Sequence, residues 1–275
     1  MPRRAARALV AAALAAAAAC VPRAPPPDLS LEPGALLEQV RAASGTVARV
    51  QGEARLQVDA PGQKGSAPAF VAAERPDRLH VEVLDFFGNP AAVLVAEGGR
   101  LAIDDRRART FYRGAATARN VARLVRLPLP PERIVALLLG EPPLEGAPAS
   151  AEPGPGIVTL VLRDGPRSTE LAVGPRAAVE RAAYRGDPAI PDHEVRYARF
   201  TDLLGGRLPE VVGIVAPGAG VRIELSWKEP DLTAPTPDAL FRMEPPSGAR
   251  VVDLDAFPDL PPLSDLPLAP QAPEH

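Results

Sequence analysis

Apolar and polar residues alternate along much of this chain, and the longest alternating run spans residues 48–59. A period of two places every second side chain on the same face. It therefore predicts a strand with one buried and one solvated face, as in an antiparallel sheet. Residues 221–228 repeat the pattern, with Val221, Ile223, Leu225 and Trp227 alternating with polar residues.

Shorter apolar runs separated by Gly, Pro and Asp turns predict further strands. The Gly98-Gly99 pair predicts a tight hairpin, whereas residues 60–66 and the Pro/Gly/Ala-rich residues 141–156 are expected to be loops. The further strands are expected at residues 67–74, 79–84, 90–96, 100–104, 110–113, 157–163, 168–173, 178–184, 193–200 and 211–216.

Three segments have helical spacing instead. Residues 31–44 predict a short amphipathic helix that begins after Pro33, and residues 116–127 place one apolar stripe opposite three arginines. Residues 131–139 begin with Pro131 and are followed by Gly140, which is typical of a helix start and a helix end. This last helix is apolar on most sides, so we expect it to be covered.

These elements predict a mainly β fold with short α-helices. An incomplete antiparallel β-barrel of about 10–11 strands would curve around the helices, which cover its concave side, within one domain spanning residues 31–254. Small inward-facing residues, Gly52, Ala54, Ala72 and Ala92, are expected to leave room for a cavity that suits acyl chains. Its expected lining is Val50, Leu56, Val81, Val83, Val93, Val95, Leu101, Ile103, Leu124, Val125, Ile134, Leu137, Leu138, Leu160, Ile223, Leu225 and Trp227.

The N-terminus has the features of an export signal. Arginines precede an apolar run of about a dozen residues, a length typical of a secretory signal and too short to span a bilayer. Cys20, the only cysteine, follows small residues, so residues 1–19 are expected to be a lipoprotein signal peptide and Cys20 the lipidated residue. The alternative is an ordinary signal peptide cleaved near Ala19. Val21 after the cysteine favours the outer membrane, with the chain anchored on its periplasmic face.

Proline-rich segments flank the predicted domain. Residues 20–30 are expected to form a solvated tether, and residues 255–275 a disordered tail or a weak docking segment.

Candidate catalytic chemistry is scarce. The net charge of −3 gives no indication of a nucleic-acid partner, and three histidines with one cysteine leave no metal-ligand spacing. No cofactor motif is present. His80 is expected to be a solvated surface residue, His193 to hold a turn or cap position, and the acids Asp104, Asp105, Asp253 and Asp255 to be solvated charges. A binding protein is therefore favoured over an enzyme.

The turn between two expected strands is unusually apolar, since it holds Phe86, Phe87 and Gly88. Apolar residues are normally excluded from such turns. Of two adjacent residues at a strand end, one is expected to face the core and one the solvent, with Phe87 as the exposed residue.

The run Leu84-Asp85-Phe86-Phe87-Gly88 is followed by two expected strands and then by the segment 126–143, RLPLPPERIVALLLGEPP. This order resembles the outer-membrane lipoprotein receptor LolB, in which a strand enters an apolar-Gly turn and an apolar-Pro linker separates two helices. Residues 237–254 are similar to the closing segment of the broader LolA/LolB-type lipoprotein-localisation fold.

The resemblance implies an acyl-chain-binding half-barrel. It also implies that Phe87 occupies the place of a protruding apolar residue that contacts the membrane, and that Phe86 replaces the preceding proline. Its expected partners are lipoprotein acyl chains or other lipids, the outer membrane through Cys20, and a periplasmic lipoprotein carrier. The expected function is to receive lipoproteins or insert them into the outer membrane. The alternative is an envelope lipoprotein of the same fold that binds another lipid or serves as an assembly scaffold.

Overall fold

The computed structural model describes residues 24–125 and 128–256, and leaves the side chains of Leu124 and Val125 undescribed. The predicted signal peptide, the predicted lipidation site at Cys20 and the tail beyond residue 256 lie outside the described residues. Among the described residues, no helix is long and apolar enough to cross a membrane.

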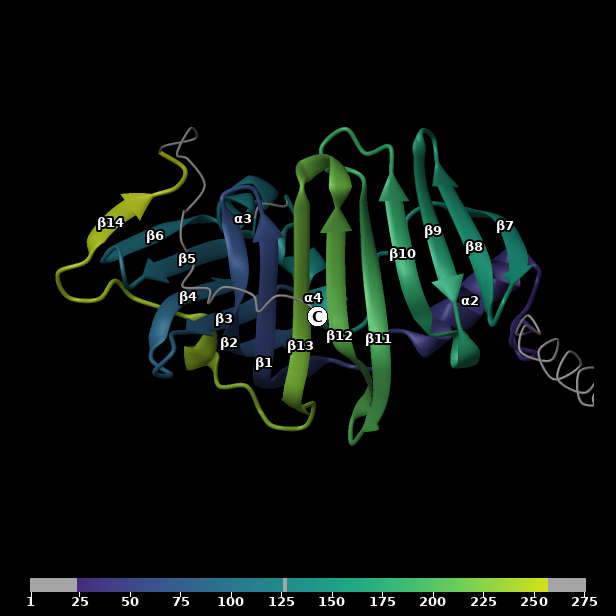
Figure 1. The fold of residues 1–275 in the computed structure, drawn as a ribbon, viewed down its shortest axis with the longest axis horizontal. Helices are drawn as coiled ribbons and strands as arrows, with labels where there is room; N and C mark the ends of the chain where they lie inside the picture. The colour runs from purple at the N-terminus through teal and green to yellow at the C-terminus, as the bar shows by residue number, and fades with distance from the viewer. Residues whose placement is uncertain (1–23, 126–127, 257–275) are drawn as a thin grey trace, which may run out of the picture.

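A single curved sheet dominates the fold (Figure 1). Its 14 strands follow the order β14-β6-β5-β4-β3-β2-β1-β13-β12-β11-β10-β9-β8-β7. The strands are β1 Arg49–Ala60, β2 Gln63–Glu74, β3 Arg78–Leu84, β4 Pro90–Glu97, β5 Arg100–Asp105, β6 Thr110–Ala115, β7 Ala147–Gly154, β8 Ile157–Asp164, β9 Arg167–Val173, β10 Val179–Arg185, β11 His193–Leu203, β12 Gly206–Ala216, β13 Val221–Asp231 and β14 Arg250–Asp253.

Apart from β14, this sheet consists of two meanders, β1 to β6 and β7 to β13, which are joined where β1 pairs with β13. The seam is antiparallel, with Leu56 opposite Leu225. A register shift lies next to Gly52, where the two backbones approach closely. A Cβ atom at Gly52 would lie 2.2 Å from the carbonyl oxygen of Glu229. Gly52 is therefore required by this contact between β1 and β13.

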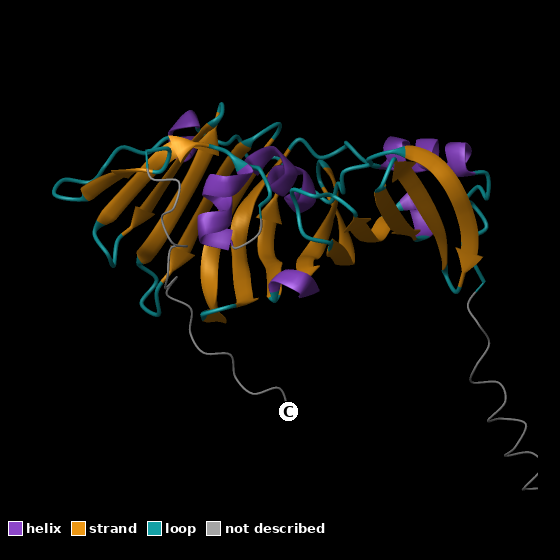
Figure 2. Ribbon diagram, turned by 90° about the horizontal axis from the view of Figure 1, so that it is seen from above, coloured by secondary structure: helices purple, strands orange, loops and turns teal. Residues whose placement is uncertain are grey.

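The helices lie on the inner side of the curved sheet (Figure 2). They are α2 Pro33–Ala43, α3 Ala118–Val125 and α4 Pro131–Leu138, with the 3₁₀ helices η2 Pro175–Ala177, η3 Pro217–Ala219 and η4 Asp238–Phe241 elsewhere in the chain. The side chain of Glu32 accepts the N–H groups of Gly34 and Ala35 at the start of α2. This helix packs against β7 and β8, and α4 packs against β3.

The predicted fold class is confirmed: the protein is mainly β, with short helices over the concave side of an open sheet. The strand number is higher than predicted, because β7 and β14 were not foreseen. β7 forms an edge of the sheet, where Pro148 and Pro153 are tolerated because the outer side of an edge strand needs no ladder partner. Residues 60–66 are also not a loop, since β1 and β2 extend to a short turn at residues 61–62.

The C-terminal residues 236–254, here termed the strap, cover the convex face of β3 to β6. Phe241 is buried, and the guanidinium carbon of Arg78 lies 4.2 Å from the centre of its ring. The strap ends in β14, which pairs parallel with β6 (Figure 1). Because the strap covers the convex face of β4, residues on both faces of this strand are buried. They form a run of six consecutive buried residues.

The structure overturns two expectations about polar residues. His80 is 7% exposed rather than solvated, and its Nδ1 lies 2.7 Å from the carbonyl oxygen of Leu240 in the strap. Asp104 is 2% exposed and pairs with Arg106 at 3.2 Å. Just beyond the strap, Asp255 accepts hydrogen bonds from the N–H of Ala115 and the side chain of Asn120, both at 2.8 Å. The contacts of His80 and Asp255 hold the C-terminal segment on the sheet.

Residues near the start of the described chain also pack on the domain. Pro26 and Leu29 are buried, and Leu29 belongs to the core beneath α2. The folded part therefore begins before residue 31.

Candidate functional site

A cavity of about 120 Å³ lies between the concave face of the sheet and the segment that carries α3 and α4. Apolar side chains from both meanders and from the helical segment form its wall. They are Leu56, Val58, Leu79, Val81, Val83, Ala92, Val93, Leu94, Ile103, Val121, Leu129, Ile134, Leu137, Leu138, Val212, Ile214, Ile223 and Leu225.

The cavity straddles the seam between β1 and β13. The opposed pairs Leu56–Leu225 and Val58–Ile223 both line it. The buried core is divided into two clusters, one centred on each meander, and Leu56 and Ile134 pack against both. The cavity therefore lies where the two core clusters meet, because their side chains leave part of the space between them unfilled.

Most of the predicted lining residues surround this cavity. They are Leu56, Val81, Val83, Val93, Ile103, Ile134, Leu137, Leu138, Ile223 and Leu225. The alternation of β1, β3 and β13 and the apolar face of α4 are the signals that identify them. Val58, Ala92, Val212 and Ile214, which also line the cavity, lie on the same strand faces or on neighbouring strands.

The other described members of the predicted lining lie elsewhere. Val50, Leu101, Leu160 and Trp227 are buried in the two core clusters. Val95 borders a second, polar cleft between β4 to β6 and the strap. Of the small residues, Ala92 lines the cavity and Gly52 is required by the seam. Ala72 lies opposite His80, whose side chain contacts the strap, so it belongs to the convex face.

Charged groups in the first turn of α4 and after its last turn hold this helix over the cavity. Arg133 in its first turn pairs with Glu145. After its last turn, Glu141 pairs with Arg75, which lies between β2 and β3. Gly140 takes a left-handed conformation with φ +80, as expected for a helix C-terminus, and a Cβ atom there would lie 2.7 Å from Pro209. These contacts fix the position of α4 over the cavity.

The turn between β3 and β4 projects two aromatic rings into solvent. Phe86 is 94% exposed and Phe87 is 84% exposed. The expectation that one of them would face the core is therefore wrong. The rings pack edge-to-face with centroids 5.6 Å apart. Both are presented on a turn whose backbone is well ordered by hydrogen bonds.

Asp85 organises this turn. Its Oδ1 accepts the N–H of Phe87 at 2.8 Å and the N–H of Asn89 at 2.9 Å, and its own N–H donates to the carbonyl oxygen of Asn89 at 2.8 Å. The hydrogen bond from Asn89 is the largest cause that lowers the pKa of the Asp85 carboxyl. Gly88 adopts φ +81, a conformation that favours glycine.

The aromatic turn and the cavity share one end of the sheet. Val83, three residues before Phe86, lines the cavity, and so does Ala92, three residues after Asn89. Leu204, the other strongly exposed large apolar residue in a hairpin turn, is 85% exposed between β11 and β12. The strand registers place that turn at the opposite end of the sheet.

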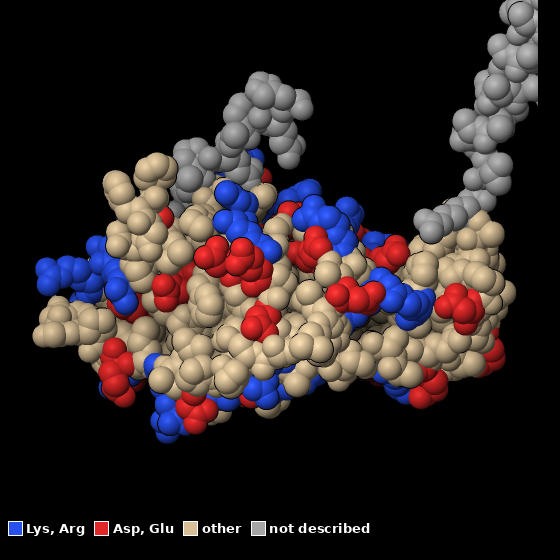
Figure 3. Space-filling model, turned by 90° about the horizontal axis from the view of Figure 1, so that it is seen from below, with Lys and Arg blue, Asp and Glu red and all other residues tan. Residues whose placement is uncertain are grey.

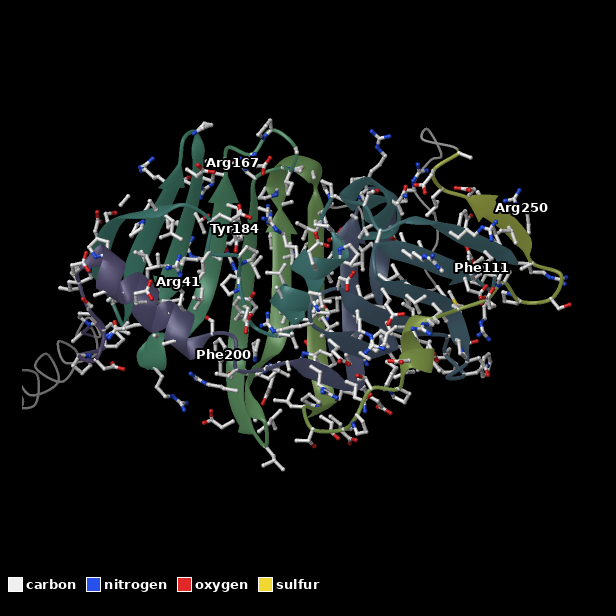
Figure 4. The ribbon with its side chains drawn as sticks, turned by 180° about the vertical axis from the view of Figure 1, so that it is seen from behind. Arg41, Phe111, Arg167, Tyr184, Phe200 and Arg250 are labelled. Carbon is white, nitrogen blue, oxygen red and sulfur yellow. The ribbon has the colours of Figure 1, made fainter. Side chains whose placement is uncertain are left out.

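A buried aromatic pair lies in the second meander, apart from the cavity. His193 stacks on Tyr184 with ring centroids 4.8 Å apart, and Tyr184 donates a hydrogen bond to the carbonyl oxygen of Pro143 at 3.1 Å. Burial lowers the pKa of His193 and raises that of Tyr184. Figure 4 shows Tyr184 in this meander, far from Phe111 and Arg250 near the strap. The pair secures the 143–145 segment and holds His193 at the strand start.

Among residues 24–125 and 128–256, no group of three His, Cys, Asp or Glu side chains is arranged to hold a metal ion.

No protein-family model and no curated protein matches this chain. Similar folds are found among solved structures. The chain is similar to a DUF1329 family protein from Desulfovibrio piger, with a TM-score of 0.52 and 13% identity over 78% of this chain and 98% of that one. A LolA superfamily protein from Nitrosomonas europaea has a TM-score of 0.48 and 12% identity over 78% of this chain and 99% of that one. At such identities, the likeness to the Desulfovibrio piger protein establishes the shared fold and nothing further.

Proposed function

We propose that this protein binds acyl chains in the cavity at the β1–β13 seam and exchanges them with a membrane at the Phe86–Phe87 turn. The observation that carries the proposal is the chemistry of the cavity wall, in which every side chain is apolar. Burying an acyl chain there requires no charged or catalytic group. A chain of about fifteen carbons gains up to about 12 kcal/mol when it is withdrawn from water.

The size of the cavity implies that binding includes a movement. Its volume of about 120 Å³ is below the roughly 300–1,000 Å³ of typical ligand pockets. In this proposal the structure corresponds to a closed state. Displacement of α4 from β3 would join the cavity to the surface, because Ile134, Leu137 and Leu138 form one of its walls. The ion pairs of Arg133 and Glu141 would break in that movement.

The aromatic turn supports transfer at a membrane. Two adjacent exposed phenylalanines are unfavourable in water and favourable at a bilayer interface. They lie at the end of strands that line the cavity, so an acyl chain leaving it near Val83 would emerge beside the inserted rings. In this proposal Phe86, Phe87 and Gly88 form the membrane-insertion turn.

The biological setting follows from the same proposal. The protein would be anchored through acylated Cys20 to the periplasmic face of the outer membrane, and would receive lipoproteins from a periplasmic carrier or insert them into that membrane. The resemblance of residues 84–143 to LolB supports this assignment, as does the fold.

The decisive experiment is to identify what the purified protein carries. The protein is isolated from membranes with mild detergent, and mass spectrometry of its organic extract is compared with that of the acyl groups attached to Cys20. Unattached acyl chains in about stoichiometric amount, and their transfer to acceptor vesicles, are expected. A protein that holds no such chain and takes none up from donor vesicles would contradict the proposal.

A further inference from the structure

The aromatic turn has a basic neighbour in the hairpin turn between β5 and β6. This second turn contains Arg106, Arg107 and Arg109. The N–H of Arg106 donates to the carbonyl oxygen of Ala91 at 3.2 Å, and Asp105 pairs with Ala92 in the sheet. Ala91 is only two residues after Asn89, so the two turns project side by side from one end of the sheet.

The arginines of this basic turn differ in their partners. Arg106 pairs with buried Asp104 at 3.2 Å. Arg107 and Arg109 are exposed, and neither forms an ion pair with any residue that the structure describes. Arg109 adopts φ +51, a conformation uncommon for a side chain of its size, and its N–H donates to the carbonyl oxygen of Arg106. The turn thus carries two exposed guanidinium groups, and that of Arg109 lies close to Gly248 of the strap.

The acidic groups nearby are already engaged. Asp85 accepts the N–H groups of the aromatic turn, and Asp105 accepts the N–H of Ala108 at 2.9 Å. Arg250, at the start of β14, adds a further positive charge beside Thr110 and hydrogen-bonds Tyr112. On the face seen in Figure 3, basic side chains gather at the end of the molecule that carries β6 and β14, whereas blue and red alternate over much of the rest.

We infer that Arg107 and Arg109 bind the headgroups of anionic phospholipids while Phe86 and Phe87 enter the interface of the same bilayer. This inference rests on the proposed function and assigns a lipid class to its membrane contact. The two turns project side by side from one end of the sheet. The phenylalanine rings of one and the guanidinium groups of the other can therefore contact the same flat bilayer surface at once. Arginine extends its charge to the headgroup level above an inserted apolar group.

The test measures co-flotation of the protein with vesicles, in a Cys20→Ser background so that no attached acyl chain contributes. The vesicles contain phosphatidylcholine alone or phosphatidylcholine with phosphatidylglycerol. The parent protein should bind the anionic vesicles more tightly, and salt should reduce this preference because the Debye length falls from about 10 Å at 0.1 M to about 3 Å at 1 M.

The variants separate the inference from the proposed function. Arg107→Gln with Arg109→Gln should reduce partition onto anionic vesicles about 25-fold, at roughly fivefold per arginine, and leave binding to neutral vesicles unchanged. The control Arg100→Gln removes an exposed arginine at the other end of β5 and should change neither. Phe87→Glu should reduce binding to both kinds of vesicle.

The outcomes are distinct. Equal binding of the parent to both kinds of vesicle, or an unchanged anionic preference in the double variant, would overturn the headgroup assignment and leave the aromatic insertion intact. Binding to neither kind would overturn the membrane contact itself, and the exposed turns would then serve a protein partner.

Discussion

The carboxylate of Asp85 accepts the N–H of Phe87 at 2.8 Å, so the exposed ring at the tip of the β3–β4 hairpin stands on a fixed turn. Rigid presentation matters for interfacial insertion, because a flexible turn would lose conformational freedom on binding. In the proposed function, the residue that orders the turn is therefore not one of the residues that would contact the membrane.

Replacing Asp85 with Ala is expected to loosen the turn and weaken vesicle binding, while leaving the exposed rings chemically unchanged. Because the pKa of Asp85 is lower in the folded state, its contribution is present above the unfolded pKa of about 3.9. It is lost as the pH falls through the folded value. Amide hydrogen exchange of residues 86–89, measured as a function of pH, tests this. Exchange as slow in Asp85→Ala as in the parent would contradict it.

Phe87→Glu should leave the free energy of unfolding within about 0.5 kcal/mol of the parent, since an exposed ring loses little packing. Lipid transfer to acceptor vesicles should be lost, and uptake of acyl chains retained. Leu204→Glu is the matched control, because Leu204 is equally exposed at the opposite end of the sheet. A large fall in melting temperature for Phe87→Glu, or unchanged transfer, would contradict the proposed role.

Ala92→Leu is expected to fill part of the cavity. It should lower acyl-chain binding without lowering the melting temperature, since the added methyl groups enter empty space beside Val83 and Leu94. Ala69→Leu is the contrast, because Ala69 is 2% exposed in a packed cluster and does not line the cavity. Overpacking there should cost about 1–3 kcal/mol. Equal losses of stability in both variants would show that no usable space exists beside Ala92.

Stability should also depend on His193. Its folded pKa is lowered by burial, so protonation favours the unfolded state. The stability is fully present above the unfolded pKa of about 6.5 and is lost as the pH falls through the folded value. Thermal unfolding between about pH 7.5 and pH 5 should therefore show a decrease in the parent that is smaller in His193→Phe. If the melting temperature fell equally in both proteins, the pH dependence would come from groups other than His193.

Phe241→Ala tests the strap. The ring is 2% exposed and contacts the guanidinium of Arg78, so its removal should cost about 3–5 kcal/mol. Hydrogen exchange should then increase in β3 to β6 before it increases in the second meander. Chemical denaturation measures the loss in the free energy of unfolding. A loss below about 1 kcal/mol would mean that the strap contributes little to stability.

The sequence pattern was most informative where one strand face is buried and the other solvated. β1 and β13 are of this kind, and their inward residues Leu56, Val58, Ile223 and Leu225 all line the cavity. The pattern failed where a distant segment covers a face. His80 alternates with apolar neighbours as a surface residue would, and only the strap, about 160 residues later, buries it.

Two other features have no strong local signal. β7 is formed from APASAEPG, whose composition is typical of a loop, and it becomes a strand because β8 offers it an edge. Contacts between segments that are distant in the sequence also determine which inward residues line the cavity. Leu160 and Ile223 are both apolar inward residues, but α2 packs against β8 and leaves no space there.

The seam between β1 and β13 has a consequence for how the chain reaches its native state. Each meander is built from neighbouring hairpins, which close short loops, whereas the seam pairs Gln51 with Asp231 and closes a very long one. Loop-closure entropy makes such a pairing slow, so the meanders are expected to form first and join last. The cavity at the seam exists only after that final step. A lipid bound there would therefore stabilise the joined state selectively, and an empty protein should come apart first along this seam.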